Sequence, residues 1–269
     1  DITSYDQRVT SAGLLDEPIF VLPKKEDVLL RTRAAGVVDD NAMATRMDDY
    51  VGALLDKIRA LGLSENTIVI FTSDHGSRGK NSVYEGGAKV PMMMKWPGQI
   101  HAGAENDSLI GNVDIAATLI DLAGGSAPAD MAKDGRSFKS QLFGKAEPKD
   151  WRTGMLIEAG NSRAIVTRDW KYVANRVTPE IQVKMTARPR EVFWTGVDHH
   201  NYQTEQMYPA YWDADQLYDL NTDLYEQQNL AEEPKHQSRL GQMQKHLDGV
   251  VAGLPHTFGE FGNLSLIHI

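Results

Sequence analysis

Cysteine is the first absence in this sequence of 269 residues, which contains none. The absence excludes disulfide bonds, thiolate metal ligands and a cysteine nucleophile within the chain, although it does not identify a cellular compartment. No run approaches the ~18–20 apolar residues of a membrane-spanning helix, so we expect no membrane span. The chain also lacks a Lys/Arg-rich run and its net charge is −9. Nucleic acid is therefore not an expected partner.

What is present describes an ordinary globular chain. Hydrophobic residues make up 41% and charged residues 24% of the sequence. The length is enough for a sizeable core, either as one large domain or as a domain with a smaller one. The sequence starts at Asp1 without an initiator Met or a signal-like segment. We therefore expect either a removed leader or a piece of a longer protein.

A long helix is predicted in the first third of the chain. Apolar residues recur every three to four positions over residues 41–61, which indicates a helical stripe. A polar residue at positions 39–41 (Asp39, Asp40 or Asn41) is expected to cap it and Gly62 to end it. Residues 1–27 are expected to be irregular, apart from one short strand at residues 19–22. The stripe consists of Met43, Met47, Tyr50, Val51, Leu54, Leu55, Ile58 and Leu61.

Two strands and a second helix follow. Strand patterns at residues 67–73 and 90–96 flank a polar loop. A helix is predicted at residues 113–123, capped by Asn112, stopped by Gly124–Gly125 and with Ile115, Leu119 and Leu122 facing inward. The order helix–strand–loop–strand–helix indicates an α/β fold, which we interpret as part of a mixed central sheet flanked by helices.

The pattern changes near Trp151, where we predict a smaller C-terminal antiparallel sheet with a helix. Residues 163–177 alternate in the β manner around a turn at Arg168–Asp169, and "QLYDL" at residues 216–220 is strand-like. Residues 237–251 are expected to form a last helix. The predicted inward side chains of that helix are Leu240, Met243, Leu247 and Val250. The predicted organisation is an α/β part at 1–150, an α+β subdomain at 151–254 and a tail at 255–269.

Polar chemistry follows the first of these strands, in "NTIVIFTSDHGSRGK". Ligands of open α/β sheets bind beyond the carboxyl ends of strands, and Asp74 and His75 lie at such an end. Because the chain turns there, the carboxylate and the imidazole could converge on one metal ion. The residues alone leave open a plainer interpretation, in which Asp74 caps the turn and His75 is an ordinary surface or core histidine.

Lys80 follows in the same glycine-containing loop, where the backbone can approach a ligand closely. Its ammonium group could meet an anion as a point charge, and the alternative is a solvated loop lysine. For Tyr84 and Glu85 we favour structural roles, a packing ring and a carboxylate held by loop amides.

These stretches resemble a known family. "NTIVIFTSDHG", "KNSVYEGGAKVPMMMKWPG" and "VDIAATLIDLAGG" look like the C-terminal half of the sulfatase family, within the alkaline-phosphatase-like superfamily. "DGRSF", "RAIVTRDWKYV" and "LYDLNTDLYEQQNLA" are similar to its later blocks, in the same order. The resemblance covers most of residues 42–231, and the order of the blocks makes it specific. It implies a sulfuric ester hydrolase, arylsulfatase-like, that acts on a sulfated small molecule or a sulfated glycan.

The resemblance also implies roles for single residues. Asp74 and His75 resemble the family's second pair of metal ligands, and Lys80 resembles the lysine that contacts the sulfate, which makes it the candidate catalytic residue. The family metal is usually Ca²⁺, whereas a histidine ligand leaves Mg²⁺ or Mn²⁺ open. In this family the smaller subdomain commonly lines the substrate cleft. His199 and His200 in "VDHHNYQTEQMYPAYW" are therefore candidate substrate-binding residues, with packing of this aromatic loop on the core as the favoured alternative.

Part of the family's machinery is not found in the chain. The family converts a Cys or Ser in a C/S-x-P/A-x-R block to formylglycine, and an N-terminal pair of Asp residues supplies the other metal ligands. The nearest string, "SAPAD" at residues 126–130, lacks the Arg, and Asp39–Asp40 precede a helix rather than follow a strand. We therefore expect no nucleophile here, a fragment without the family's N-terminal half, and no sulfatase activity of the chain alone.

Two other interpretations stay open. A phosphodiesterase or phosphonate hydrolase of the same superfamily also uses Asp and His metal ligands, although Lys80 and the "YEGG" block favour a sulfatase. The chain could also be a non-catalytic binding module. The family suggests a periplasmic or secreted location, and the sequence predicts neither the substrate nor the oligomeric state.

Overall fold

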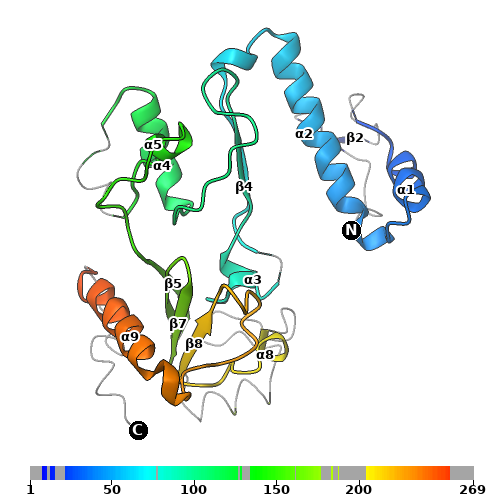
Figure 1. Cartoon of the computed structure of the whole chain (residues 1–269). Coiled ribbons are helices and arrows are strands. Elements are labelled where there is room, and N and C mark those ends of the chain that lie inside the picture. The colour runs from blue at the N-terminus through cyan, green and yellow to red at the C-terminus, as the bar shows by residue number, and fades with distance from the viewer. Residues whose placement is uncertain are drawn as a thin grey trace. The chain divides into compact units, whose positions relative to one another are not determined.

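The structure is a computed structural model, and contacts divide its chain into two compact units (Figure 1). One unit comprises Asp1–Val69 with Lys95–Gln99, and the other Ile70–Met94 with Ile100–Ile269. The predicted boundary near residue 150 stays a prediction. The structure describes residues 8–10, 13–15, 22–76, 78–126, 128, 134–160, 162–176, 183, 187 and 204–254.

The first unit begins with elements that the sequence pattern did not reveal. Strands β1 (Arg8–Thr10) and β2 (Gly13–Leu15) pair antiparallel, and helix α1 spans Lys25–Ala34. The prediction of irregular structure up to residue 27 is therefore wrong. Helix α1 has no apolar stripe, and it buries only Val28 and Thr32. Of the strand predicted at residues 19–22, residues 19–21 lie outside the described residues, and the described residue at position 22 forms a bend.

The predicted long helix is confirmed as α2 (Ala42–Ala60), and Gly62, with φ +67°, follows its end. The capping prediction is wrong for Asn41, which makes no capping hydrogen bond through its side chain, and the side chain of Asp40 lies outside the described residues. Asp39 instead pairs with Arg33 at 2.6 Å. Much of the apolar stripe of α2 is exposed. Its exposed members are Met43 (44%), Met47 (48%), Tyr50 (41%), Leu54 (66%) and, just beyond the helix, Leu61 (57%).

The α/β pattern is confirmed in the elements that follow α2. Strands β3 (Val69–Thr72) and β4 (Met92–Lys95) pair in a two-stranded sheet. Helix α4 spans Val113–Leu122, and Gly124 follows it with φ +77°. The short helices are α3 (Glu85–Ala88), α5 (Lys139–Leu142), α8 (Thr204–Met207), η1 (Asp39–Asn41), η2 (Ser64–Asn66) and η3 (Pro234–His236).

The buried side of α4 is polar, contrary to the sequence prediction. Leu119, predicted to face inward, is 39% exposed, whereas Asp114 and Thr118 are buried. The hydroxyl of Thr118 accepts a hydrogen bond from the backbone of Phe138 at 3.1 Å. Hydrogen bonds of buried polar side chains thus join the helix to the "DGRSF" segment, while Ile115 and Leu122, also predicted to face inward, are half-buried.

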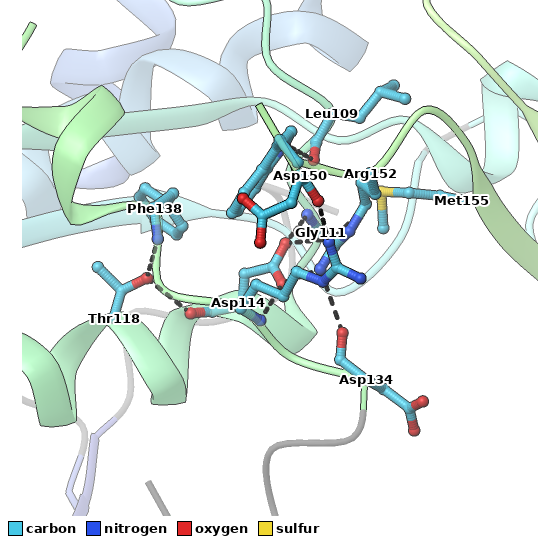
Figure 2. A network of polar contacts seen from close by, with 11 residues as sticks. Leu109, Gly111, Asp114, Thr118, Asp134, Phe138, Asp150, Arg152 and Met155 are labelled. Carbon is cyan, nitrogen blue, oxygen red and sulfur yellow. Dashed lines mark hydrogen bonds and ion pairs between the residues drawn. The ribbon is translucent and has the colours of Figure 1, made fainter. Parts of the chain in front are cut away.

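Asp114 is the centre of this polar network (Figure 2). Its two carboxylate oxygens each lie 2.6 Å from a guanidinium nitrogen of Arg152. They also accept hydrogen bonds from the backbone amides of Gly111 at 2.8 Å and Arg136 at 2.7 Å. Four donors thus satisfy a carboxylate with no exposed surface, which is what burial of a charge requires.

The C-terminal part forms a four-stranded antiparallel sheet in the order β5-β6-β7-β8. Its strands are β5 (Met155–Ala159), β6 (Ser162–Val166), β7 (Trp170–Asn175) and β8 (Asp215–Asp219). The predicted hairpin around Arg168–Asp169 and the strand at "QLYDL" are confirmed. Strand β5 was not predicted.

Both faces of this sheet are covered. Helix α9 (Gln237–Ala252) lies along one face (Figure 1). It packs Leu240, Met243 and Leu247, as predicted, against Ile165, Tyr172 and Leu217. Side chains alternate along a strand, so the neighbouring residues point to the other face. There Ala164, Val173 and Tyr218 pack with Val83, Tyr84 and Tyr208. The predicted antiparallel sheet with a helix is confirmed.

In the part of the chain that the structure describes, no helix is both long and apolar enough to span a membrane.

Candidate functional site

The candidate site lies where β3 ends and the chain turns. Asp74 and His75 follow this strand, with 85% and 34% of their side chains exposed. The His75 Nε2 atom lies 3.5 Å from the Asp74 Oδ2 atom. The backbone amide of His75 donates a hydrogen bond to Asp74 Oδ1 at 3.0 Å. The turn therefore brings the carboxylate and the imidazole together, as the sequence predicted.

The other nitrogen of His75 is held by the backbone. Its Nδ1 lies 2.8 Å from the carbonyl oxygen of Gly76. Because a carbonyl only accepts hydrogen bonds, Nδ1 carries the proton, and in the neutral ring Nε2 then has a free lone pair. A backbone carbonyl orients many metal-binding histidines in this way. The residues thus fit a divalent cation through Asp74 Oδ2 and His75 Nε2.

Electrostatics keep Asp74 ionised. Desolvation in the turn acts to raise the pKa of its carboxyl, but attraction to the His75 imidazole when it is protonated, backbone hydrogen bonds and attraction to Lys80 outweigh this effect and lower the pKa. Lys80 is half-buried in the same loop. Its charge thus acts on Asp74, and its role as the sulfate contact stays a prediction.

Asn112 holds the backbone of the turn in place. Its amide nitrogen donates to the carbonyl of Ser73 at 3.0 Å. The hydroxyl of Ser73 donates in turn to the carbonyl of His75 at 2.7 Å. The sequence suggested Asn112 as a helix cap, but its side chain makes no capping bond. The sequence indicated only that Asn112 precedes α4. The fold shows that its side chain reaches the turn.

Glycines allow the loop to fold tightly on itself. The amides of Gly76 and Arg78 donate to the carbonyls of Gly87 at 2.8 Å and Gly86 at 3.1 Å. A Cβ atom on Gly76 would lie 2.1 Å from the Gly86 carbonyl oxygen, so only glycine fits there. The "YEGG" block is therefore the support of the loop that carries the candidate ligands.

Tyr84 and Glu85 have structural roles, as predicted. The ring of Tyr84 is buried and stacks on Tyr208, with 3.8 Å between the ring centres. The prediction that loop amides hold the Glu85 carboxylate is wrong. A buried ammonium group, that of Lys171, lies 2.8 Å from it.

The structure describes only some of the site residues that the sequence predicts. The described residues contain no group of three or more His, Asp or Glu side chains placed to hold a metal ion. Asp74 and His75 are thus a pair of ligands rather than a complete site. His199 and His200 lie outside the described residues, and their role stays a prediction.

Known proteins share this sequence pattern. The sulfatase family model matches residues 38–126, which include the turn and the "YEGG" block. An ulvan-active sulfatase of Formosa agariphila is 32% identical over 227 residues, which are 80% of this chain and 42% of that relative. The chain belongs to the sulfatase family.

The fold of this sulfatase chain also occurs in solved structures. A protein in complex with its substrate D-glucosamine-2-N,6-O-disulfate matches 78% of this chain and 39% of its own, with a TM-score of 0.58 and 22% identity. A phosphonate monoester hydrolase of Agrobacterium radiobacter matches 81% and 42%, with a TM-score of 0.55 and 23% identity. At these identities the likeness shows the fold alone, so the fold does not separate the two chemistries. The sulfatase chain spans less than half the length of each of these proteins.

Proposed function

We propose that this chain contributes two metal ligands, Asp74 and His75, and an anion contact, Lys80, to the active site of an enzyme that hydrolyses sulfate esters. One observation carries the proposal. The Gly76 carbonyl fixes the proton of His75 on Nδ1, and Nε2 then lies 3.5 Å from the Asp74 carboxylate. The sulfatase family of the chain gives this pair its proposed purpose.

The side chains have separate tasks in this proposal. Asp74 supplies a carboxylate oxygen and negative charge to the cation. His75 supplies a neutral nitrogen, and Lys80 offsets charge on the sulfuryl oxygens as the S–O bond breaks. A divalent cation, Ca²⁺ by the family resemblance with Mg²⁺ or Mn²⁺ as alternatives, polarises the sulfate when bound. Two ligands do not fill the ~6–8 positions that Ca²⁺ prefers, so further ligands must come from elsewhere.

The nucleophile is the component that this sequence does not encode. No C/S-x-P/A-x-R string occurs in it. The formylglycine on which the family mechanism depends therefore has no precursor in these residues. We expect the 269-residue chain by itself to release no sulfate from an aryl sulfate above a buffer blank.

A sulfated glycan is the proposed substrate class. The Formosa relative is named for activity on ulvan, and the complexed protein of similar fold has a disulfated glucosamine as its substrate. His199 and His200 would then bind the sugar. Replacing both with Ala in an active enzyme should raise KM for a sulfated sugar more than KM for a small aryl sulfate. An equal effect on both substrates would contradict this role.

A chimaera tests the proposed function. The residues of this chain would replace the aligned 227 residues of the Formosa sulfatase, which supplies the remainder of the enzyme. We expect the chimaera to release sulfate, and Asp74→Ala or His75→Ala to lower kcat/KM by at least ~100-fold, because each removes a ligand of the catalytic cation.

The matched control is Asp248→Asn, which removes an exposed carboxylate from α9 and should leave the rate unchanged. A folded chimaera that releases no sulfate would contradict the proposal. Full activity after replacement of both Asp74 and His75 would contradict it as well.

A further inference from the structure

Three charged side chains form a buried cluster next to the candidate site. The ammonium nitrogen of Lys171, on β7, lies 2.8 Å from Glu85 Oε1 and 2.9 Å from Glu226 Oε1. The side chains of Lys171 and Glu226 have no exposed surface, and that of Glu85 is 10% exposed. None of these residues belongs to the candidate metal pair.

Burial of these three charged groups carries a large desolvation penalty. The buried ammonium group of Lys171 faces two carboxylates, and the exposed Lys89 lies farther away, with its Nζ 3.8 Å from Glu85 Oε2. Burial raises the pKa of Glu226, and attraction to Lys171 offsets this only in part. The contact between Lys171 and Glu226 Oε1 also lacks hydrogen-bond alignment. Apolar residues of similar volume often stabilise a fold better than such clusters, so the charges point to a requirement for defined geometry.

The cluster fixes the start of α3. Glu226 Oε2 accepts a hydrogen bond from the backbone amide of Glu85 at 2.6 Å. Glu226 itself has φ +56°, an unusual conformation for a residue other than glycine. Beside it, the Tyr84 hydroxyl donates to Gln216 Oε1 of β8 at 2.8 Å. Lys171 and Glu226 thus tie both the side chain and the main chain of Glu85 to the sheet.

From Glu85 the contacts continue to the candidate ligands. The next two residues, Gly86 and Gly87, offer their carbonyls to the amides of Arg78 and Gly76. The carbonyl of Gly76 in turn accepts the Nδ1 proton of His75. Each link is a short contact between two groups, and the path ends at the bond that sets the tautomer of His75.

We propose that Lys171, Glu85 and Glu226 form a positioning cluster that sets the conformation of residues 74–76 and 78–80, and with it the orientation of His75 toward Asp74. This inference rests on the proposed function only in assigning metal binding to the loop. Lys171→Met removes the charge at its centre and is the most direct perturbation.

Amide hydrogen exchange and imidazole NMR of the full chain test this role without metal or substrate. In Lys171→Met the amides of Gly76, Arg78 and Glu85 should lose at least ~10-fold in protection, because exchange reports local opening. The β6–β7 ladder should change by less than ~3-fold. The ring nitrogens of His75 should report one Nδ1–H tautomer in the unmodified chain and a mixture in the variant.

Tyr172→Phe is the matched control. Tyr172 follows Lys171 on β7 but packs on the α9 face, and its hydroxyl bonds to Asp215 at 2.5 Å. It should leave the loop amides and the His75 tautomer unchanged. If Lys171→Met does not fold, Glu226→Gln should give a smaller loss of protection at the same amides.

Unchanged protection and an unchanged tautomer in a folded Lys171→Met chain would overturn the inference. Equal opening of the loop in Tyr172→Phe would overturn it too, since the effect would then be general destabilisation. Because neither readout requires catalysis, the inference can hold even if the chimaera is inactive, and it can fail while the chimaera is active.

Discussion

Two ion pairs on α4 show how strongly the surroundings of a residue decide what its charge contributes. The Asp114 side chain has no exposed surface and that of its partner Arg152 only 10%. Asp121 and its partner Lys139 are 44% and 37% exposed. The two charges of the first pair are desolvated, whereas those of the second pair are still solvated. Removing one charge should therefore lower the free energy of unfolding by very different amounts in the two pairs.

Asp114→Ala should therefore lower the free energy of unfolding by ~3–5 kcal/mol, because it leaves Arg152 without its buried partner. Asp121→Ala is the control and should cost less than ~1 kcal/mol. Urea titration of both variants provides the comparison. Similar losses in the two variants would contradict the importance assigned to burial.

The buried Glu226 predicts a dependence of stability on pH. Burial raises the pKa of its carboxyl above the ordinary 4.5, despite attraction to Lys171, and Glu85 raises it further. The folded state thus holds this proton more tightly than the unfolded state. The resulting stabilisation is complete below about pH 4.5 and is lost as pH rises through the folded-state pKa. Glu226→Gln should remove this component and flatten the fall in Tm above pH 4.5. Parallel Tm profiles would contradict the prediction.

At the scale of elements, close backbone packing distinguishes the "YEGG" turn from the helices around it. A Cβ atom on Gly76 would meet the Gly86 carbonyl at 2.1 Å, whereas one on Gly249 of α9 would meet nothing within 4 Å. The turn therefore needs glycine for space, and the helix does not.

Gly76→Ala should cost ~1–3 kcal/mol, as overpacking does, and should disturb the loop that carries His75. Gly249→Ala should instead stabilise the chain by ~0.5–1 kcal/mol, because alanine favours a helix. Urea unfolding and proton chemical shifts of the His75 ring would check both. A neutral Gly76→Ala with an unchanged ring signal would show that the turn tolerates a side chain.

The elements also show what the sequence could predict. Local periodicity predicts helices α2, α4 and α9 and strands β3, β4 and β6–β8. The sequence suggested Asp74 and His75 as candidate ligands because they are adjacent at a strand end. The positioning cluster could not be found in this way, since Glu85 is 86 positions from Lys171 and 141 from Glu226. Which face of α4 is buried also depended on distant partners.

At the scale of the whole molecule, helix α2 carries a stripe of exposed apolar side chains in the part of the chain that the structure describes. Met43, Met47, Tyr50 and Leu54 share a helical stripe with 41–66% of their surfaces exposed. Contiguous apolar surface of this kind favours association. The described core of the unit that contains α2 is small, consisting of Val28 and Ala42 with Leu29 beside them.

We therefore expect the isolated chain to associate with itself as concentration rises, and the double variant Met47→Glu, Leu54→Glu to reduce this. Ala44→Glu with Ala60→Glu adds the same charge at exposed positions of α2 and should reduce it less. Sedimentation velocity would measure both. A chain that stays monomeric at all concentrations would contradict a role of the stripe in association.

Asp74 and His75 are proposed as two ligands of one divalent cation. Mn²⁺ titration of the ¹⁵N-labelled chain tests this proposal most directly, because paramagnetic broadening reveals even weak binding. The account predicts selective broadening of the amides of residues 73–76, abolished in Asp74→Asn, His75→Gln and retained in Asp248→Asn. Absence of broadening in the unmodified chain, or its persistence after both ligands are replaced, would contradict the account.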